Sequence, residues 1–171
     1  MNHSLVFTFI GLDRPGLVER LADIVADHQG NWLESRMTQL AGQFAGIARV
    51  SVPESELEEL TNALQCLNIE GLTITIQAGQ AVTASPTPKI CKLHILGNDR
   101  PGIVREVSRA LKQQQINVLE FNSNITSAAM SGDPLFEAHV RSEIPVDCDF
   151  DELESSLDAI AEQLSVDIIL S

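Results

Sequence analysis

The chain has 171 residues, of which 44% are hydrophobic and 20% are charged. This composition is sufficient for a packed core and excludes a disordered chain, and the length suits one or two small domains better than a large enzyme barrel. The formal net charge is -13, from 24 acidic against 11 basic residues. Because such a surface repels phosphate groups, we expect no direct contact with nucleic acids or with membranes.

The chain carries no obvious signal for export. Residues 1–20 lack the charged and apolar regions of a signal peptide, and no apolar run reaches the roughly 18 residues of a membrane span. Three cysteines, Cys66, Cys91 and Cys148, are an odd number without CxxC spacing, which favours thiols over a disulfide framework. We therefore expect a cytoplasmic protein.

In chain order, the first predicted element is a short apolar strand over residues 5–10, which we expect Gly11 to end. The segment that follows it is repeated. Residues 11–18 read GLDRPGLV, and residues 97–104 read GNDRPGIV, with six of eight positions identical at an offset of 86. The offset persists through Asn31 and Asn117 and through Glu34 and Glu120. The chain therefore contains two copies of one module.

The rest of each copy predicts a helix, two strands, a second helix and a last strand. Amphipathic helices over 17–25 and 103–111 follow the Pro-Gly pairs, and their predicted buried faces include Val18 and Val104. Strands in which apolar and polar residues alternate start near Phe44 and Phe136. The loop before the second of these strands is six residues longer than its counterpart in the first copy. The last strands are predicted over residues 72–76 and 166–170.

This order predicts an α+β protein with two ferredoxin-like βαββαβ domains, each an antiparallel sheet with helices on one face. We place the first domain at residues 1–80, a Pro-containing linker at 81–88 and the second domain at 89–171.

The repeated motif is the candidate ligand site. We expect Asp13 and Asp99 to cap the backbone N–H groups of the helices, and Pro15 and Pro101 to occupy the first helical turns. Open amides at a helix start, aided by the helix dipole, can bind the carboxylate of an amino acid. The candidate ligand-binding residues are Leu12, Asp13, Arg14, Pro15, Gly16, Leu17, Val18 and Asn31 in the first copy, and Asn98, Asp99, Arg100, Pro101, Gly102, Ile103, Val104 and Asn117 in the second.

Each group of candidates has a plainer alternative. The motif can be only a tight strand-to-helix turn, with its Asn capping a loop, and the arginines can be solvated instead of holding a carboxylate. The second copy is the stronger candidate, because Asn98 replaces Leu12 and adds a polar group beside the turn.

The sequence offers no cofactor, metal or catalytic motif that we retain. Residues 147–151 begin like a calcium loop but lack its later Gly and Glu, and the four histidines show no ligand spacing, although His94 and His139 could meet across neighbouring strands. An acylphosphatase-like enzyme would use Arg14 and Asn31 but needs a phosphate cradle that is missing. An RNA-recognition module would need exposed aromatic residues on a basic sheet face.

The two motifs, each followed by an Asn 15 residues after the Gly of Pro-Gly, resemble the ACT domain, and the resemblance covers nearly the whole chain twice. The tandem order and the run of Asn31, Glu34, Ser35 and Arg36 are most similar to the transcriptional repressors of the glycine cleavage system. The resemblance implies a regulator that binds amino acids at interfaces between paired modules, with glycine as the presumed signal. It also implies action on a transcriptional activator protein without direct DNA binding.

Binding therefore explains the sequence better than catalysis does, and a homo-oligomer is among the expected assemblies. A protein–protein adaptor with the same fold and no ligand is the competing hypothesis.

Overall fold

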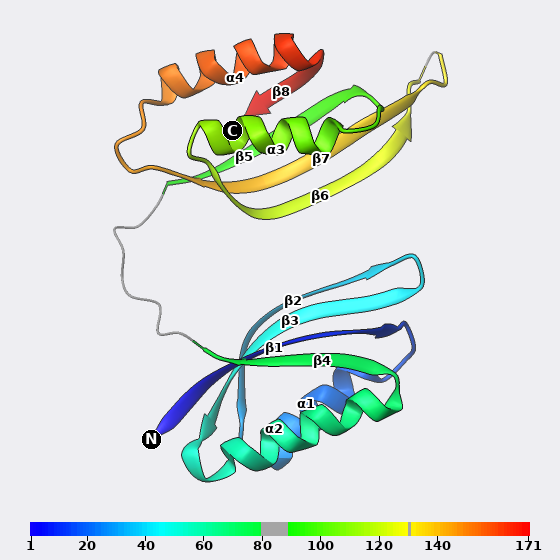
Figure 1. The fold of residues 1–171 in the computed structure, drawn as a ribbon, viewed down its shortest axis with the longest axis vertical. Helices are drawn as coiled ribbons and strands as arrows, with labels where there is room; N and C mark the ends of the chain where they lie inside the picture. The colour runs from blue at the N-terminus through cyan, green and yellow to red at the C-terminus, as the bar shows by residue number, and fades with distance from the viewer. Residues whose placement is uncertain (80–88, 130) are drawn as a thin grey trace. The chain divides into compact units, whose positions relative to one another are not determined.

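The computed structural model describes residues 1–79, 89–129 and 131–171. The chain divides into two compact units, Met1–Thr83 and Ala84–Ser171. Each unit contains strand, helix, strand, strand, helix and strand in that order (Figure 1). The predicted α+β fold with two ferredoxin-like units is confirmed, while the linker predicted at 81–88 lies outside the described residues.

The first unit is a four-stranded antiparallel sheet in the order β2-β3-β1-β4, with α1 and α2 covering one face (Figure 1). Its elements are β1 (Asn2–Leu12), α1 (Leu17–Asp27), β2 (Asn31–Leu40), β3 (Gln43–Pro53), the short 3-10 helix η1 (Glu54–Glu56), α2 (Leu57–Cys66), the short 3-10 helix η2 (Leu67–Glu70) and β4 (Leu72–Ala78).

The second unit repeats this topology, with the order β6-β7-β5-β8 and with α3 and α4 on one face of its sheet (Figure 1). Its elements are β5 (Lys89–Asn98), α3 (Ile103–Gln113), β6 (Asn117–Ser127), β7 (Pro134–Ile144), α4 (Phe150–Leu164) and β8 (Val166–Leu170).

Each core lies between one sheet face and its two helices. Alternate residues of β1 and β5 point into it, among them Phe7 and Ile95, which are fully buried. The alternation predicted for the strands that start near Phe44 and Phe136 is confirmed, since Val50 of β3 and Val140 of β7 are buried. Val18 and Val104 are wrong as core residues, since they are 43% and 44% exposed. Both lie in the first helical turn, beyond the edge of the stripe that faces the sheet.

The strands before the repeated motif are longer than predicted. Gly11 and Gly97 do not end β1 and β5, because pairing continues through Leu12 and Asn98. A side chain at Gly97 would place its Cβ 2.6 Å from Val166, and one at Gly11 would lie 2.7 Å from Leu72. These glycines therefore permit the close approach of the last strand instead of breaking the first.

The duplication extends to an irregularity in the sheets. A β-bulge interrupts the β2–β3 register between Trp32 and Glu34, and another interrupts the β6–β7 register between Val118 and Glu120. An extra residue in one strand changes which side chains beyond it face the core. Because the bulge occurs at the same place in both units, the two units keep the same pattern of inward and outward side chains along these strands.

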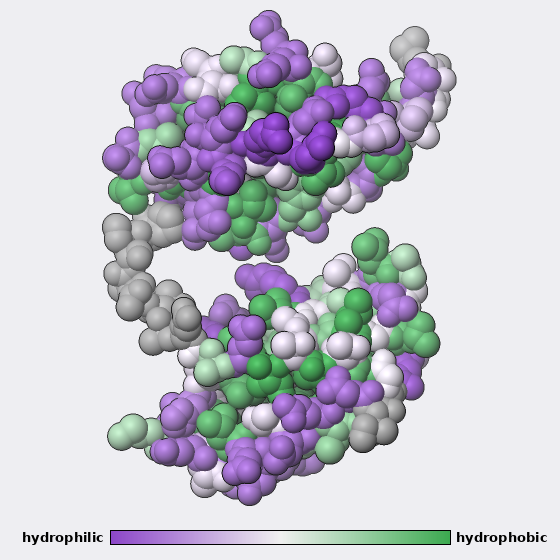
Figure 2. Space-filling model, viewed as in Figure 1, coloured by the Kyte–Doolittle hydropathy of each residue, from purple (hydrophilic) through white to green (hydrophobic). Residues whose placement is uncertain are grey.

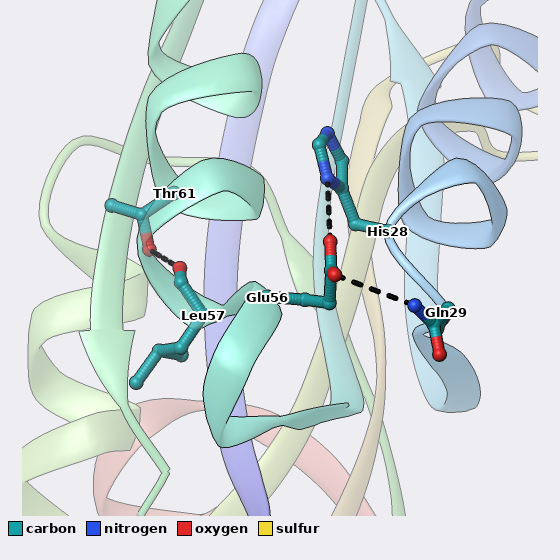
Figure 3. Close-up of polar contacts among 5 residues, drawn as sticks. All are labelled: His28, Gln29, Glu56, Leu57 and Thr61. Carbon is teal, nitrogen blue, oxygen red and sulfur yellow. Dashed lines mark hydrogen bonds and ion pairs between the residues drawn. The ribbon is translucent and has the colours of Figure 1, made fainter.

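In the first unit, a polar contact joins the end of α1 to the start of α2 (Figure 3). Glu56 Oε2 lies 3.4 Å from His28 Nδ1, and Gln29 Nε2 donates a hydrogen bond of 3.3 Å to Glu56 Oε1. Within α2, Thr61 Oγ1 donates to the carbonyl of Leu57 at 2.7 Å. The contact between His28 and Glu56 therefore links the segment that follows α1 to the segment that precedes α2.

The surface of the first unit exposes hydrophobic residues among polar ones (Figure 2). Leu12 and Leu40 are 69% and 75% exposed, and both are in register with Gln43. The second unit has Asn98 and Thr126 at the matching positions, so the corresponding end of its sheet is more polar. Among the described residues, no helix has the length and apolar character needed to cross a bilayer.

Candidate functional site: the strand-to-helix turns

The two repeated motifs form the same turn. Gly16 immediately precedes α1 with φ 88° and ψ 0°, and Gly102 immediately precedes α3 with φ 89° and ψ -1°. A positive φ of this size is strained for residues with a Cβ and natural for glycine. The Pro-Gly pair therefore fixes the direction in which each helix leaves the sheet.

The predicted side-chain caps are wrong. Neither α1 nor α3 receives a hydrogen bond from a capping side chain, and the capping positions are occupied by Gly16 and Gly102 instead of Asp13 and Asp99. Pro15 and Pro101 precede those glycines and so lie outside the first helical turns. The aspartates act through their backbone amides, which donate to Gly42 O at 2.9 Å and to Pro134 O at 3.0 Å. These bonds tie each turn to the neighbouring hairpin.

The turns are open to solvent on one side and anchored on the other. The buried anchors are Leu17 and Ile103, at 5% and 3% exposure. The exposed candidates are Leu12, Asp13, Arg14, Pro15, Gly16 and Val18 in the first turn, and Asn98, Asp99, Pro101, Gly102 and Val104 in the second. Since the helices lack side-chain caps, this exposed side presents the first turns of α1 and α3 to a ligand.

Arg100 was predicted to hold the carboxylate of a ligand, but in the structure it contacts groups of its own unit. Its Nη2 donates to Glu106 Oε2 at 2.6 Å and to Leu164 O at 3.2 Å. The hydrogen bond from Arg100 holds the pKa of the Glu106 carboxyl below its usual value, and the same contact raises the pKa of Arg100. Arg100 thus fastens the turn to α3 and to the end of α4. The position matching Glu106 is Arg20 in the first unit, so the contact between Arg100 and Glu106 is not repeated at the matching positions.

Asn31 and Asn117 do not join the turns within their own units. Asn98 is in register with Leu135 of β7, whereas Asn117 is in register with Glu143, eight residues further along that strand. At about 3.4 Å per residue, this separation is roughly 27 Å, which is far longer than an amino acid. Asn117 Nδ2 instead donates to Glu143 Oε2 at 3.0 Å. Asn31 occupies the same end of β2 in the first unit.

A cavity of about 880 Å³ opens beside the second turn. Asn98 is common to the turn and to the wall of this cavity, and Asp158, Glu162 and Asp167 supply acidic groups to the same wall. The remaining lining residues are Leu96, Gly97, Leu135, Ala159, Ala161, Ser165 and Val166. In the first unit, the space beside the turn is only about 60 Å³ and is lined by Leu12, Arg14, Leu17, Gly71 and Leu72.

Sequence reasoning missed the acidic wall because it comes from α4 and β8, about 60 residues after the motif. One feature of the sequence could have indicated part of this acidic wall. Asp158 and Glu162 are four residues apart, and therefore lie on one face of the predicted second helix.

Comparison with known proteins agrees with the fold. Residues 3–77 match the ACT domain family. A UPF0237 protein of Methanococcus maripaludis is 31% identical over 77 residues, which are 43% of this chain and 86% of that protein. The chain belongs to the ACT domain family.

Relatives that span both ACT units also exist. The glycine cleavage system transcriptional repressor of Escherichia coli K12 is 22% identical over 165 residues, covering 96% of this chain and 87% of the repressor. The crystal structure of an unknown protein from Galdieria sulphuraria has a TM-score of 0.86 at 28% identity, covering 100% of this chain and 98% of the other.

A crystal structure provisionally described as a glycine cleavage system transcriptional repressor has a TM-score of 0.77 at 19% identity, over 100% of this chain and 97% of that one. The likeness to this structure concerns the fold. Together the two whole-chain structural matches show that the two-unit fold occurs in other proteins.

The left-handed glycine gives a test of the turn. We expect Gly102→Ala to lower the free energy of unfolding by about 1 kcal/mol, because a Cβ in this backbone conformation is strained. The added Cβ would meet nothing closer than 3.5 Å, so backbone strain is the main cost. Urea denaturation measures the change, and exposed Ser108→Ala in α3 is the control. A loss no larger than the control's would contradict the left-handed turn.

The Arg100–Glu106 pair gives a test by pH. Since its folded pKa is lowered, the Glu106 carboxylate stabilises the unit at pH values above its unfolded pKa, and this contribution is lost as pH falls through the folded pKa. Glu106→Gln should therefore be less stable than wild type near neutral pH, and the two should converge below the usual glutamate pKa of about 4.3. Denaturation midpoints across pH measure this. A difference that is constant with pH would contradict the ion pair.

Proposed function

We propose that this protein is an amino-acid-responsive transcriptional regulator of the glycine cleavage system that acts through a protein partner, a transcriptional activator, without touching DNA. It works in the cytoplasm by binding and not by catalysis. The observation that carries the proposal is the joining of an open helix-start turn to an acidic cavity through Asn98.

The two parts of this site have the charges that a zwitterionic amino acid needs. We place the ligand carboxylate at the amides of the first turn of α3 that follow Ile103, whose own N–H donates to Arg100 O at 3.3 Å; the helix dipole favours a negative group there. The ligand ammonium group is placed against the acidic wall formed by Asp158, Glu162 and Asp167. Asn98 offers both a donor and an acceptor between these two ends. Glycine, the smallest amino acid, is the ligand we propose first.

The second unit is the proposed ligand site, and the first unit has another role. The space beside the first turn, about 60 Å³, is lined by Leu12, Arg14 and Leu17 without an acidic residue. The exposed Leu12 and Leu40 at the same end of that unit suit contact with a protein better than contact with a polar ligand. We therefore propose one amino-acid site per chain.

Action through a partner is supported by charge and by the relatives. A net charge of -13 disfavours binding to the DNA backbone. The Escherichia coli relative over 96% of the chain carries the name of a glycine cleavage system transcriptional repressor. Amino-acid binding would change the affinity for the partner only as far as the ligand prefers one state of the protein, typically a coupling of about 1 to 3 kcal/mol.

The competing function is that of a ligand-free adaptor, which the exposed leucines of the first unit also favour. The two functions differ in a single measurement. Partner capture from the native host should change when glycine is added if the protein is a sensor, and should be indifferent to every amino acid if it is an adaptor.

Isothermal titration calorimetry with glycine tests the proposed site. We expect one equivalent to bind per chain, and Asn98→Leu, which gives the second unit the residue of the first, to weaken binding at least about tenfold, the effect of losing a hydrogen bond to a charged ligand group. Serine and alanine are titrated in parallel to rank ligand size.

Two variants serve as controls. Asn62→Ala removes an exposed amide from α2 and should change nothing. Asn117→Ala should also leave the affinity unchanged, because Asn117 lies at the other end of the sheet from Asn98. A loss in Asn117→Ala equal to that in Asn98→Leu would contradict a site within one unit, and no heat with any amino acid would contradict the sensor.

A further inference from the structure

Two strands of the second unit bring together three side chains that can bind a metal ion. His94 of β5 and His139 of β7 are directly opposite each other in the antiparallel register. Glu137 precedes His139 by two residues, so both project from the same face of β7. The neighbours Ile95 and Ala138 are fully buried beneath the helices, so the three side chains lie on the opposite face of the sheet. The two helices of the unit do not cover that face (Figure 1).

The ligand atoms of these residues converge. His94 Nε2 lies 2.9 Å from Glu137 Oε1, and His139 Nε2 lies 3.6 Å from the same oxygen. The two imidazole rings stack with their centroids 4.6 Å apart at an angle of 13°. All three ligand atoms lie within 4.8 Å of one another. Ligands of one tetrahedral zinc ion are about 3.3 Å apart, given bonds of about 2.0 to 2.1 Å, so small side-chain rotations are enough to surround an ion.

Surrounding groups favour the charged form of the carboxylate. The hydrogen bond from His94 lowers the pKa of Glu137, and the nearby His139 and a hydrogen bond from Asn124 act in the same direction. Asn124 lies opposite Glu137 on β6, and a partner of this kind orients a carboxylate ligand. The proton that His94 Nε2 donates to Glu137 would move to Nδ1 when a metal takes the Nε2 lone pair.

The first unit supplies an internal comparison. At the positions in register with those of the cluster it has Thr8, Ala45 and Ile47, none of which is a metal ligand. The first unit does contain a histidine paired with a glutamate, His28 with Glu56, but that contact has Gln29 as its third member (Figure 3). Within the part of the chain that the structure describes, the three-ligand arrangement belongs to the second unit.

We propose that His94, Glu137 and His139 form a binding site for one divalent transition-metal ion of the zinc class. Two imidazole nitrogens and one carboxylate oxygen are a ligand set that suits Zn²⁺, Co²⁺ or Ni²⁺, whereas Mg²⁺ and Ca²⁺ require more oxygen ligands. Three protein ligands leave a fourth position for water or for a group from another molecule. The side chains are 33%, 27% and 64% exposed, so an ion can reach them from solvent.

The site differs from the proposed amino-acid site in its residues and in its face of the sheet. Its ligands do not include any residue of the strand-to-helix turn or of the acidic cavity. Metal binding can therefore succeed or fail independently of glycine binding.

The test uses the full chain, free of any histidine tag and stripped of metal, titrated with CoCl₂ and with ZnCl₂. We expect one equivalent of Co²⁺ per chain, seen as visible d–d absorption that one equivalent of Zn²⁺ abolishes. His94→Thr and His139→Ile give the second unit the residues that the first tolerates at the same register. Each should weaken Co²⁺ binding by more than about tenfold, since even outer partners of a metal ligand are worth 10- to 100-fold.

His28→Thr is the matched control, because it removes a histidine that faces a glutamate in the first unit, and it should bind Co²⁺ as wild type does. Far-UV circular dichroism checks that each variant is folded. The proposal is overturned if wild type shows no Co²⁺ absorption. It is also overturned if binding survives in both cluster variants, if His28→Thr loses as much affinity as they do, or if MgCl₂ competes as well as ZnCl₂.

Discussion

The candidate amino-acid site depends on one backbone constraint, the left-handed conformation of the glycine that immediately precedes the first helix of each unit. Gly16 and Gly102 adopt it within a few degrees of each other. Because this conformation sends the chain from the strand directly into the helix without a capping side chain, the helix start is left exposed while Leu17 or Ile103 is buried beneath it. The proposed binding of an amino acid requires that geometry.

The duplicated units keep this turn and differ around it. Where the first has Leu12 and Arg20, the second has Asn98 and Glu106, so the second turn gains a polar neighbour and an ion pair. Ile47 of the first unit corresponds to His139 of the second, which turns an apolar sheet position into a potential ligand. At these positions the differences make the second unit more polar than the first. Two copies of one fold can in this way divide ligand binding and partner contact.

Much of the fold could be predicted because each element predicted in one copy of the repeat can be checked against the matching segment of the other copy. The period of two in the strands and the helical stripes predicted the order of strands and helices in each unit, and β8 was predicted at its observed bounds. The short 3-10 helices η1 and η2 were not predicted. The capping roles of Asp13 and Asp99 could not be predicted correctly, since an Asp ahead of a Pro-Gly pair fits a side-chain cap and a backbone-paired turn equally well. Sequence spacing also could not place Asn117 far from Asn98. That separation arises because α3 runs back along the sheet after β5 ends at Asn98. The next strand, β6, therefore begins with Asn117 at the opposite end of the sheet.

The histidine cluster shows where local patterns fall short. The meeting of His94 and His139 across neighbouring strands could be predicted, but the part that Glu137 plays in the cluster was not. The alternation that places Glu137 and His139 on one face was already visible in the sequence. What the sequence lacked was the pairing register, which places His94 opposite His139 and brings the three ligand atoms together.

The measurement that tests the central claim most directly is an ¹H–¹⁵N correlation spectrum of the full chain recorded during a glycine titration. The account predicts that the largest amide shifts occur at residues 99–104, with smaller changes along α4 and little change at residues 13–18. Shifts of equal size in both turns, or shifts confined to residues outside the second turn, would contradict it.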